Sequence, residues 1–280
     1  MQLMTDRQAY EMYLCCFPDY PTGFACFCNV MRPDSAVQFC AWEGDVAVGC
    51  AMVHENAVAM LCVLPEYRGR GHGSELLRRA EAHIRTEGHA TMSLGGNLLQ
   101  GVPDAPGNTV PFFERRGYSA DWTSVNMALP LTDFDPQRLQ IPNPPANLSF
   151  RFAGEADRPA LLRAAEAANA GWEDIYQRVL GDVPVLLAEE NGEILGCEIL
   201  GPRGGRFVTG GAQMGDIGCV GVVPAARNRG VGRAMVAHGA AWLKEQGCDL
   251  IELRFVALVD WYRAIGFEVT GRQWMGGKRL

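Results

Sequence analysis

Hydrophobic and polar residues follow the same order twice along this chain. In the first half, apolar runs at residues 37–42 and 46–53 flank the turn Glu43-Gly44-Asp45, a pattern that predicts a β-hairpin. Residues 58–64 form a further apolar run, which we expect to be the next strand. Residues 74–86 then repeat apolar side chains at helical spacing and predict an amphipathic helix. Three strands followed by a helix are therefore expected in the first half.

Weaker patterns complete the first half. Residues 6–16 predict an amphipathic helix, and residues 91–94 predict a short strand. A loop rich in Gly, Pro and Asn runs from there to Pro111, and residues 112–116 then predict a helical turn that ends at Gly117.

The second half repeats this order. Its expected elements are a helix at residues 156–170, a hairpin from residues 185–189 and 194–200, and strands at residues 216–223 and 250–255. The two strands at 216–223 and 250–255 are separated by another amphipathic helix. The second half is therefore expected to have the same fold as the first.

A proline-rich segment separates the two halves. Residues 131–148 contain four prolines, which exclude a regular helix and predict an extended, fairly stiff linker. We therefore expect an N-terminal domain at residues 1–130, a linker at residues 131–147 and a C-terminal domain at residues 148–280.

A glycine-rich turn with two arginines marks the same point in both halves. Arg68-Gly69-Arg70-Gly71-His72-Gly73 corresponds to Arg227-Asn228-Arg229-Gly230-Val231-Gly232 at an offset of 159 positions. Each turn follows an apolar run that ends in proline, and each precedes an amphipathic helix. Residues 261–267 match residues 112–118 at an offset of 149, which places ten additional residues in the loop of the first half. Such a repeat predicts a duplicated domain.

This turn has the chemistry of a phosphate site. The backbone N–H groups in the first turn of a helix lack partners, and the helix dipole adds positive charge there. Glycine lets the backbone approach a ligand closely, and arginine adds charge-assisted hydrogen bonds, so a diphosphate fits such a helix end. Neither turn is a Walker A loop or a good dinucleotide-binding fingerprint. The alternative is a tight strand-to-helix turn that needs glycine only for its shape.

Composition narrows the class of protein. A chain of 280 residues has room for two domains, and an apolar fraction of 48% is typical of globular proteins. The net charge of −7 argues against a nucleic-acid partner, because nucleic-acid binding needs a strongly basic surface. No apolar run approaches the length of a membrane span, and the first residues lack the layout of a secretory signal. We therefore expect a cytoplasmic protein with no nucleic-acid or membrane partner.

The ten cysteines and five histidines do not suggest a metal site. No pair of them has the spacing of zinc ligands, so no metal is expected. Many of the cysteines lie in apolar runs, where a free thiol packs as a small hydrophobic group in a reducing compartment. No cysteine has an activating neighbour in the sequence, so none is predicted to be a nucleophile.

The motif Val-x-Pro-x-x-Arg-x-Arg-Gly-x-Gly at residues 222–232, with Tyr-x-x-x-Gly-Phe at residues 262–267, resembles the GCN5-related N-acetyltransferase (GNAT) superfamily. The resemblance covers both halves. It implies an α/β fold of two tandem GNAT-like domains, each a mixed, mostly antiparallel sheet with a splayed parallel strand pair flanked by helices. It also implies acetyl-coenzyme A as the donor, with the pyrophosphate at the glycine-rich turn and the pantetheine arm between the splayed strands.

The resemblance implies a set of coenzyme contacts in each half. In the second half the implied contacts are Val220, Val222, Arg227, Arg229, Gly230, Val231 and Gly232. In the first half they are Val63, Arg68, Arg70, Gly71, His72 and Gly73.

Two further residues distinguish the halves. Amide formation from a thioester needs a base for the amine, donors for the oxyanion and an acid for the thiolate. Some family members carry a carboxylate base eleven positions before the first arginine of the turn, which is Asp216 in the second half, counted from Arg227, and Ala57 in the first, counted from Arg68. The tyrosine that protonates the departing thiolate in this family corresponds to Tyr262, and the first half has Phe113 at this position. A solvated strand end for Asp216 and a packing role for Tyr262 are the alternatives, but both differences predict that the second half is the catalyst.

The predicted function is transfer of an acetyl group from acetyl-coenzyme A to a primary amine of a small molecule or peptide. Three roles remain open for the first half: a weak second catalytic site, a coenzyme-binding domain or a scaffold. The chain could also form a homodimer. Residues 172–176 either bind the amine by cation–π and ionic contacts or form an ordinary amphipathic helix. The alternative functions are a non-enzymatic acyl-coenzyme A sensor or assembly module, and an acyltransferase with a larger acyl donor or an amino-sugar acceptor.

Overall fold

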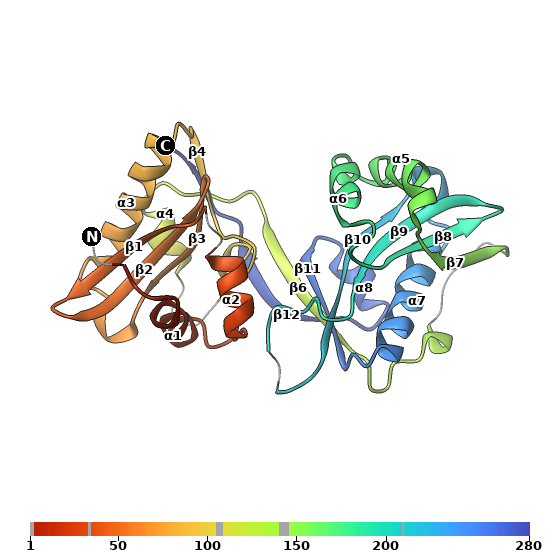
Figure 1. Cartoon of the computed structure of the whole chain (residues 1–280), viewed down its shortest axis with the longest axis horizontal. Coiled ribbons are helices and arrows are strands. Elements are labelled where there is room, and N and C mark those ends of the chain that lie inside the picture. Colours follow the sequence, from red (N-terminus) through yellow and green to blue (C-terminus); the bar gives the residue numbers. More distant parts are fainter. Residues whose placement is uncertain (1–2, 33–34, 105–108, 140–145, 209) are drawn as a thin grey trace. The chain divides into compact units, whose positions relative to one another are not determined.

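The computed structural model describes residues 3–32, 35–104, 109–139, 146–208 and 210–280. The chain forms two compact α/β units, each with its own sheet and flanking helices (Figure 1). The first unit contains Met1–Asn126, Arg206–Thr209 and Thr270–Leu280, and the second contains Met127–Gly205 and Gly210–Val269.

The sheet of the first unit begins with the predicted hairpin. Strands β1 (Val37–Glu43), β2 (Val46–His54) and β3 (Ala57–Val63) are antiparallel neighbours, and β4 (Thr91–Leu94) lies parallel to β3. The outer neighbour of β4 is β13 (Gly277–Arg279). The order of the sheet is therefore β1-β2-β3-β4-β13.

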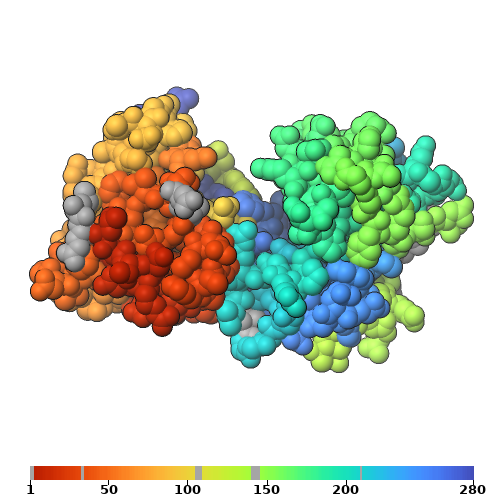
Figure 2. All heavy atoms as spheres, viewed as in Figure 1, coloured from red at the N-terminus to blue at the C-terminus, as the bar shows by residue number. Residues whose placement is uncertain are grey.

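Helices cover both faces of this sheet. Helices α1 (Asp6–Cys16) and α2 (Phe24–Met31) pack on one face, where Tyr13 and Phe27 are fully buried, and they form a continuous layer in the view of Figure 2. Helix α3 (His72–Thr86) packs on the opposite face through a second apolar cluster, which also includes residues of the short helix α4 (Val110–Glu114). The predicted amphipathic patterns at residues 6–16 and 74–86 are thus confirmed as helices.

The second unit repeats this arrangement. The strands β7 to β11 are neighbours in the order of the chain, and each neighbouring pair is antiparallel except β10 and β11, which are parallel. Their bounds are β7 Leu148–Phe152, β8 Val185–Glu190, β9 Glu193–Gly201, β10 Met214–Val222 and β11 Leu250–Val256. Helices α5 (Arg158–Ala168) and α6 (Trp172–Val179) lie on one face, and α7 (Val231–Glu245) lies on the other (Figure 1). The short helix α8 (Val259–Arg263) follows β11.

Each unit contains a parallel strand pair that separates after a few residues. Strand β3 pairs with β4 only at Ala57 and Val58, and β10 pairs with β11 only at residues 214–216. Beyond these positions the paired strands diverge, which confirms the splayed parallel pair in both halves. Helical turns follow each splayed strand, at Pro65–Tyr67 and Pro224–Ala226, and lead into α3 and α7.

The division between the units falls within two strands, β6 (Thr123–Pro130) and β12 (Glu268–Trp274), and also on either side of Arg206–Thr209. The end of β12 pairs with β5 (Val102–Pro103), and β13 then pairs with β4 through Gly277↔Ser93 and Arg279↔Thr91. The last residues of the chain are therefore grouped with the first unit, whereas the sequence placed all of residues 148–280 in a second domain. A repeat shows where each copy begins, but it does not show which segment pairs with a free strand edge.

The segment predicted to be a linker is only partly described. Residues 140–145 lie outside the described residues, and a single helical turn occupies Pro136–Arg138. Among the described residues, no helix is long and apolar enough to cross a membrane.

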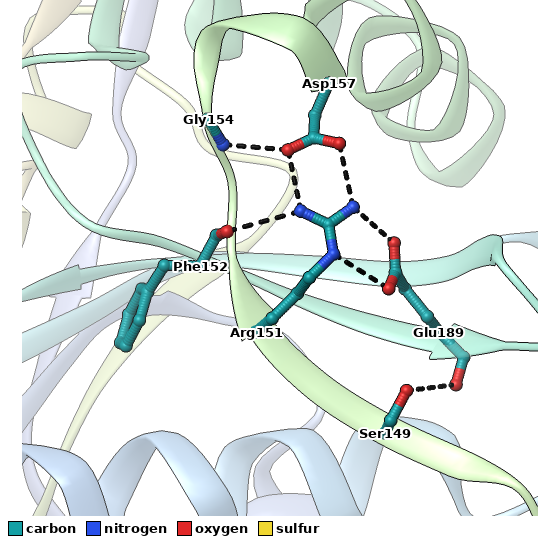
Figure 3. A network of polar contacts seen from close by, with 6 residues as sticks. All are labelled: Ser149, Arg151, Phe152, Gly154, Asp157 and Glu189. Atoms are coloured by element: carbon teal, nitrogen blue, oxygen red, sulfur yellow. Dashed lines mark hydrogen bonds and ion pairs between the residues drawn. The ribbon is translucent and has the colours of Figure 1, made fainter.

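A guanidinium group connects three segments at the edge of the second unit (Figure 3). Arg151 on β7 donates two hydrogen bonds of 2.7 Å to Asp157, just before α5, and bonds of 2.6 and 2.9 Å to Glu189 on β8. Asp157 also accepts a 2.8 Å bond from the Gly154 amide. The bonds from Arg151, with that from Gly154, lower the pKa of Asp157 to about 2.

Replacing Arg151 with methionine is expected to destabilise the second unit by about 1 kcal/mol, because paired carboxylates lose a bidentate partner. The expected loss of stability is small because the Arg151 side chain is 44% exposed and solvent screens its ion pairs. The matched control is Arg263→Met, which removes a single exposed ion pair with Asp260 and should change stability by less than about 0.5 kcal/mol. Equal unfolding midpoints in urea for the two variants would contradict the prediction.

Candidate active site

The two glycine-rich turns have the same backbone conformation. The residues before each helix, Gly71 and Gly230, have φ of 94° and 73°, in the left-handed region. Two positions earlier, Gly69 and Asn228 are also left-handed, with φ of 79° and 61°. Glycine and asparagine are the residues that adopt this conformation most readily, so the motif needs these residue types for its shape. The similarity at the level of dihedral angles confirms that the turn was duplicated together with the fold.

Each turn presents free backbone amides to a cavity. The first helical hydrogen bonds are donated by Glu75 to the Gly71 carbonyl and by Ala234 to the Gly230 carbonyl, at 3.1 and 3.0 Å. The amides of the preceding helical residues are therefore not used within the helix. In the second unit these residues, Val231 and Gly232, line the cavity, so amides and helix dipole provide positive potential there.

The first arginine of each turn fixes the turn to its strand. Nε of Arg68 donates to the Val63 carbonyl at 3.0 Å, and Nε of Arg227 donates to the Val222 carbonyl at 3.1 Å. Arg227 also reaches the Ala168 carbonyl at the end of α5 with a 2.8 Å bond. Both arginines line a cavity, so they stabilise the turn and remain in reach of a ligand.

The second arginine of each turn has a different environment. Arg70 is paired with Glu43 at 2.9 Å, and Arg229 with Glu190 at 2.9 Å. Neither arginine is among the residues that line the cavities. His72 does line the first cavity, and its Nε2 lies 2.7 Å from Glu43. The structure thus places Arg70 and Arg229 against carboxylates at a strand end, where the sequence had expected coenzyme contacts.

In each unit a cavity lies between one strand of the splayed pair, the glycine-rich turn and the short helix α8 or α4, with volumes of about 640 Å³ in the second unit and 620 Å³ in the first. Equivalent positions line both, including Val63 and Val222 on the strands and Gly73 and Gly232 in the turns. Val220 also lines the cavity of the second unit. The main difference is that residues of α5 and α6, including Trp172, contribute to the second cavity.

The strand beside the second cavity has a β-bulge at a position where the first unit's strand is paired; the register shift of β2 and β3 lies earlier, between Met52 and Val53. The register between β10 and β9 shifts between Gly218 and Gly221, so Cys219 and Val220 have no partners across the strand pair. Cys219 has φ of 48°, which is unusual for a residue with a side chain, and its carbonyl accepts a 2.6 Å bond from the Tyr176 hydroxyl. Bulges of this kind release backbone groups from the sheet. In the first unit the corresponding residues, 60 and 61, remain paired with β2.

Tyr262 lines the second cavity, and Phe113 lines the first at the equivalent position. The Tyr262 ring packs edge-on against Trp261 and Phe267, with centroid separations of 4.7 and 5.5 Å. Burial, and secondarily the nearby Glu198 and Cys219, raise the pKa of Tyr262 above its ordinary value of 10.0. Its hydroxyl is therefore a proton donor throughout the neutral range, whereas Phe113 has no proton to give.

Asp216 lies on β10, three residues before the bulge. Its Oδ2 accepts a 3.1 Å bond from Arg254 on β11, and Nε of Arg254 lies 4.0 Å from Glu252. Asp216 is adjacent to Glu252 across the last paired positions of the splayed strands. Asp216 is not among the residues that line the 640 Å³ cavity, so the structure does not bring it together with Tyr262 there.

The additional loop of the first unit fills the space beside its splayed strands. Leu98 and Leu99 are 0% and 2% exposed and pack in the same cluster as Met60. Gly96 lies so close to β3 that a Cβ atom there would be 2.8 Å from Ala59. A cavity of only about 70 Å³ remains between the loop and β3. The first unit therefore keeps the cavity beside its glycine-rich turn, while its loop fills most of the space on the other side of β3.

Residues 172–176 lie in the helix α6, which has one buried and one exposed face, as the second of the two expectations had it. Trp172 lines the cavity and Tyr176 is fully buried and holds the bulge, but Glu173 and Asp174 are exposed. Sequence reasoning missed the bulge itself and the buried Glu198 opposite it. The glycines at 218 and 221, which flank the bulge, were the available signal.

Comparisons with known proteins agree with this geometry. A family model described as Acetyltransferase (GNAT) domain matches residues 34–120 and again residues 181–269. A protein named mycothiol acetyltransferase from Tsukamurella paurometabola is 30% identical over 225 residues, which cover 73% of this chain and 72% of that protein.

Solved structures share the fold over nearly the whole chain. A GCN5-related glucosamine N-acetyltransferase region of a fungal multi-domain β-N-acetylglucosaminidase aligns with a TM-score of 0.82 at 22% identity, covering 97% of this chain and 36% of that chain. A tandem GNAT protein from the clavulanic acid biosynthesis pathway aligns with a TM-score of 0.70 at 16% identity, covering 98% of this chain and 94% of that chain. At these identities the likeness shows the fold alone.

Proposed function

This chain belongs to the GNAT family as a tandem acyltransferase, and we propose that its second unit transfers an acetyl group from acetyl-coenzyme A to a primary amine of a small molecule. One observation carries the proposal. In the second unit a tyrosine hydroxyl, the unpaired bulge residue Val220 and a helix N-terminus border one 640 Å³ cavity, whereas the first unit has the cavity without the tyrosine, and its equivalent residues 60 and 61 stay paired with β2.

The residues around this cavity fit the proposed coenzyme. Free amides of the first turn of α7, together with Arg227, would bind the diphosphate. A Cβ atom at Gly232 would lie 3.2 Å from Trp261 and 3.3 Å from Val222, so a larger residue there would fill part of the cavity. Val220 and Val222 would lie along the pantetheine arm. Arg229 is expected to act indirectly, by fixing the turn through Glu190.

The chain's own groups would act on the reaction in three ways. Backbone N–H groups near Val220, which the bulge releases from the sheet, would stabilise the oxyanion. Tyr262 would protonate the departing sulfur, and Asp216 would take the proton of the amine through water. Arg254 would hold the Asp216 carboxylate in place for that step. Fixing both reactants in one cleft would supply a further part of the rate.

The relatives suggest which acceptors to test first. Because relatives of this chain are named mycothiol acetyltransferases, we propose an acceptor amine that belongs to a small thiol of that class. An amino sugar is the second acceptor to test, since the fungal structure is described as a glucosamine N-acetyltransferase region. A panel of acetyl and longer acyl donors would test the acyl group.

We further propose that the first unit binds the same coenzyme without turning it over. Valine at Gly71 or Gly230 is expected to abolish coenzyme binding in the affected unit alone, because a β-branched residue is strained at positive φ. Calorimetric titration with acetyl-coenzyme A should give two sites in the natural chain and one in each variant. Only Gly230→Val should lose turnover of the amine, and Gly71→Val is its matched control.

Other outcomes would decide between functions. Coenzyme binding with no acetylation of any amine in the panel would favour a sensor or an assembly module. Loss of turnover in Gly71→Val, with turnover kept in Gly230→Val, would move the catalyst to the first unit and contradict the proposal.

A further inference from the structure

Seven of the ten cysteines lie in the first 62 residues, and the fold brings four of them together on one face of the first unit's sheet. Cys40 and Cys50 are opposite each other on β1 and β2, and Cys50 is opposite Cys62 on β3. Cys16, in the last turn of α1, packs against Cys62. The second unit has no such group among its described residues, because Gly221 occupies the position equivalent to Cys62.

Cys16 packs against the buried cluster that contains Cys62. Sγ of Cys16 lies 3.5 Å from the carbonyl of Val63, the residue after Cys62. A hydrogen bond from Cys62 lowers the pKa of Cys16, and the positive Arg68 guanidinium lowers it further, while burial acts in the opposite direction. A thiolate that is stabilised by a second thiol and a cation is the arrangement found in reactive dithiols.

Access separates this pair from the other cysteines of the group. Cys16 is half-buried at the end of α1, and Cys62 lines the 620 Å³ cavity of the first unit. Cys40 and Cys50 are 4% and 0% exposed and line no described cavity. A small reagent can therefore reach Cys16, whereas the pair on β1 and β2 is enclosed in the core.

We propose that Cys16 and Cys62 form a redox-active dithiol in the wall of the first cavity, oxidised by a low-molecular-weight disulfide. The Cys16 thiolate attacks one sulfur of the small disulfide and releases one small thiol, which leaves a mixed disulfide on Cys16. The Cys62 thiol, after losing its proton to solvent, attacks the Cys16 sulfur and releases the second small thiol. The protein loses two hydrogens and two electrons, and the small disulfide gains both.

The location gives this reaction a consequence for the cavity. Arg68 fixes the glycine-rich turn through the Val63 carbonyl and also lies beside the Cys16 sulfur. Oxidation links the end of α1 to β3 next to the cavity. The inference concerns the first unit and does not depend on acetyl transfer in the second.

The test uses the full chain with glutathione disulfide as the oxidant. Cys15, exposed and adjacent to Cys16, would complicate peptide mapping, so the experiment is done with Cys15→Ser as the parent. After oxidation, blocking of free thiols and digestion, mass spectrometry should find the peptides of Cys16 and Cys62 joined by a disulfide. Cys16→Ser and Cys62→Ala in the same parent should abolish the cross-link.

The enclosed pair provides the matched control. Cys40→Ala in the same parent should leave the cross-link between Cys16 and Cys62 unchanged. Glutathione retained on Cys16 while Cys62 stays free, a cross-link between Cys40 and Cys50 instead, or two unmodified thiols would each overturn the proposal. Cys16 is only half-buried, so Cys16→Ser is expected to fold even if Cys62→Ala does not. The inference can then be tested with Cys16→Ser alone.

Discussion

Replacing Tyr262 with phenylalanine is expected to lower kcat for amine acetylation by about 10²- to 10⁴-fold, the range that a positioned general acid contributes. The thiolate must then leave without a proton. The ring contacts with Trp261 and Phe267 persist, because phenylalanine keeps the aromatic surface that Tyr262 packs with. Affinity for acetyl-coenzyme A should therefore stay within about twofold in calorimetry, since the lost interaction belongs to the transition state.

The pH dependence of kcat gives a second test of this role. Burial raises the pKa of Tyr262 above 10.0, so the acid stays protonated over the neutral and mildly alkaline range. The natural enzyme should show no loss of kcat from deprotonation of this group below that pH. An unchanged kcat in Tyr262→Phe, or a change confined to KM, would contradict the assignment.

The first unit supplies a matched variant. Phe113→Tyr places a hydroxyl at the position equivalent to Tyr262, but Leu98 and Leu99 still fill the adjacent space, and residues 60 and 61 are still paired with β2. We therefore expect no acetylation by this unit when it is measured in the Gly230→Val background. Activity there would show that the hydroxyl alone separates the two units.

Most of the fold could be predicted because hydrophobic periodicity and turn chemistry are local. The helices at residues 6–16 and 74–86 and the hairpins of both halves follow directly from spacing within short segments. The repeat then extended each local inference to the other half. The glycine positions were predictable for the same reason, since a left-handed turn restricts which residues can occupy it.

Features that depend on distant partners could not be predicted. The contact between β13 and β4 joins the end of the chain to residues 91–93, and nothing in either segment specifies the other. The same holds for Arg70 and Arg229, whose charge suggested a phosphate partner, although a carboxylate at a strand end was within reach of each. The motif therefore predicted the backbone shape of the loop, but it did not predict which side-chain partners its arginines have.

Asp216 illustrates the same limit at the site itself. The spacing placed it on the strand that leads to the glycine-rich turn, and the structure has it there, on β10. Its pairing with Arg254 comes from β11, the strand that diverges from β10 a few residues later. The sequence could indicate the residue and its strand, whereas its ion pair depends on a neighbouring strand 38 positions away.

Glu198 on β9 is buried without a partner, and this makes the stability of the second unit dependent on pH. Its side chain is 0% exposed, and neither carboxyl oxygen has a hydrogen-bond partner among the described residues. The neighbouring helix α7 has Gly239 at this point, where a Cβ atom would collide with Oε1. Burial raises the pKa of Glu198 from 4.5 to about 8, so the acid is mostly neutral at pH 7.

The sign of the effect follows from proton linkage. Between pH 4.5 and about 8 the folded chain holds a proton on Glu198 that the unfolded chain has released. Unfolding therefore releases a proton, and the free energy of unfolding falls by about 1.4 kcal/mol for each pH unit in this window. The stability contributed by Glu198 is fully present below pH 4.5, and about 4 to 5 kcal/mol of the free energy of unfolding is lost by about pH 8.

Replacing Glu198 with methionine, an unbranched apolar side chain of similar length, is expected to remove this dependence. The stability of Glu198→Met relative to the natural chain should rise by several kcal/mol from about pH 5 to about pH 8 in urea unfolding. The matched control is Glu193→Gln, an exposed residue at the start of the same strand, which should follow the natural chain at every pH. Because other titrating groups are shared, their contributions cancel in the comparison. A constant difference between Glu198→Met and the natural chain would show that this carboxyl does not change its charge on unfolding.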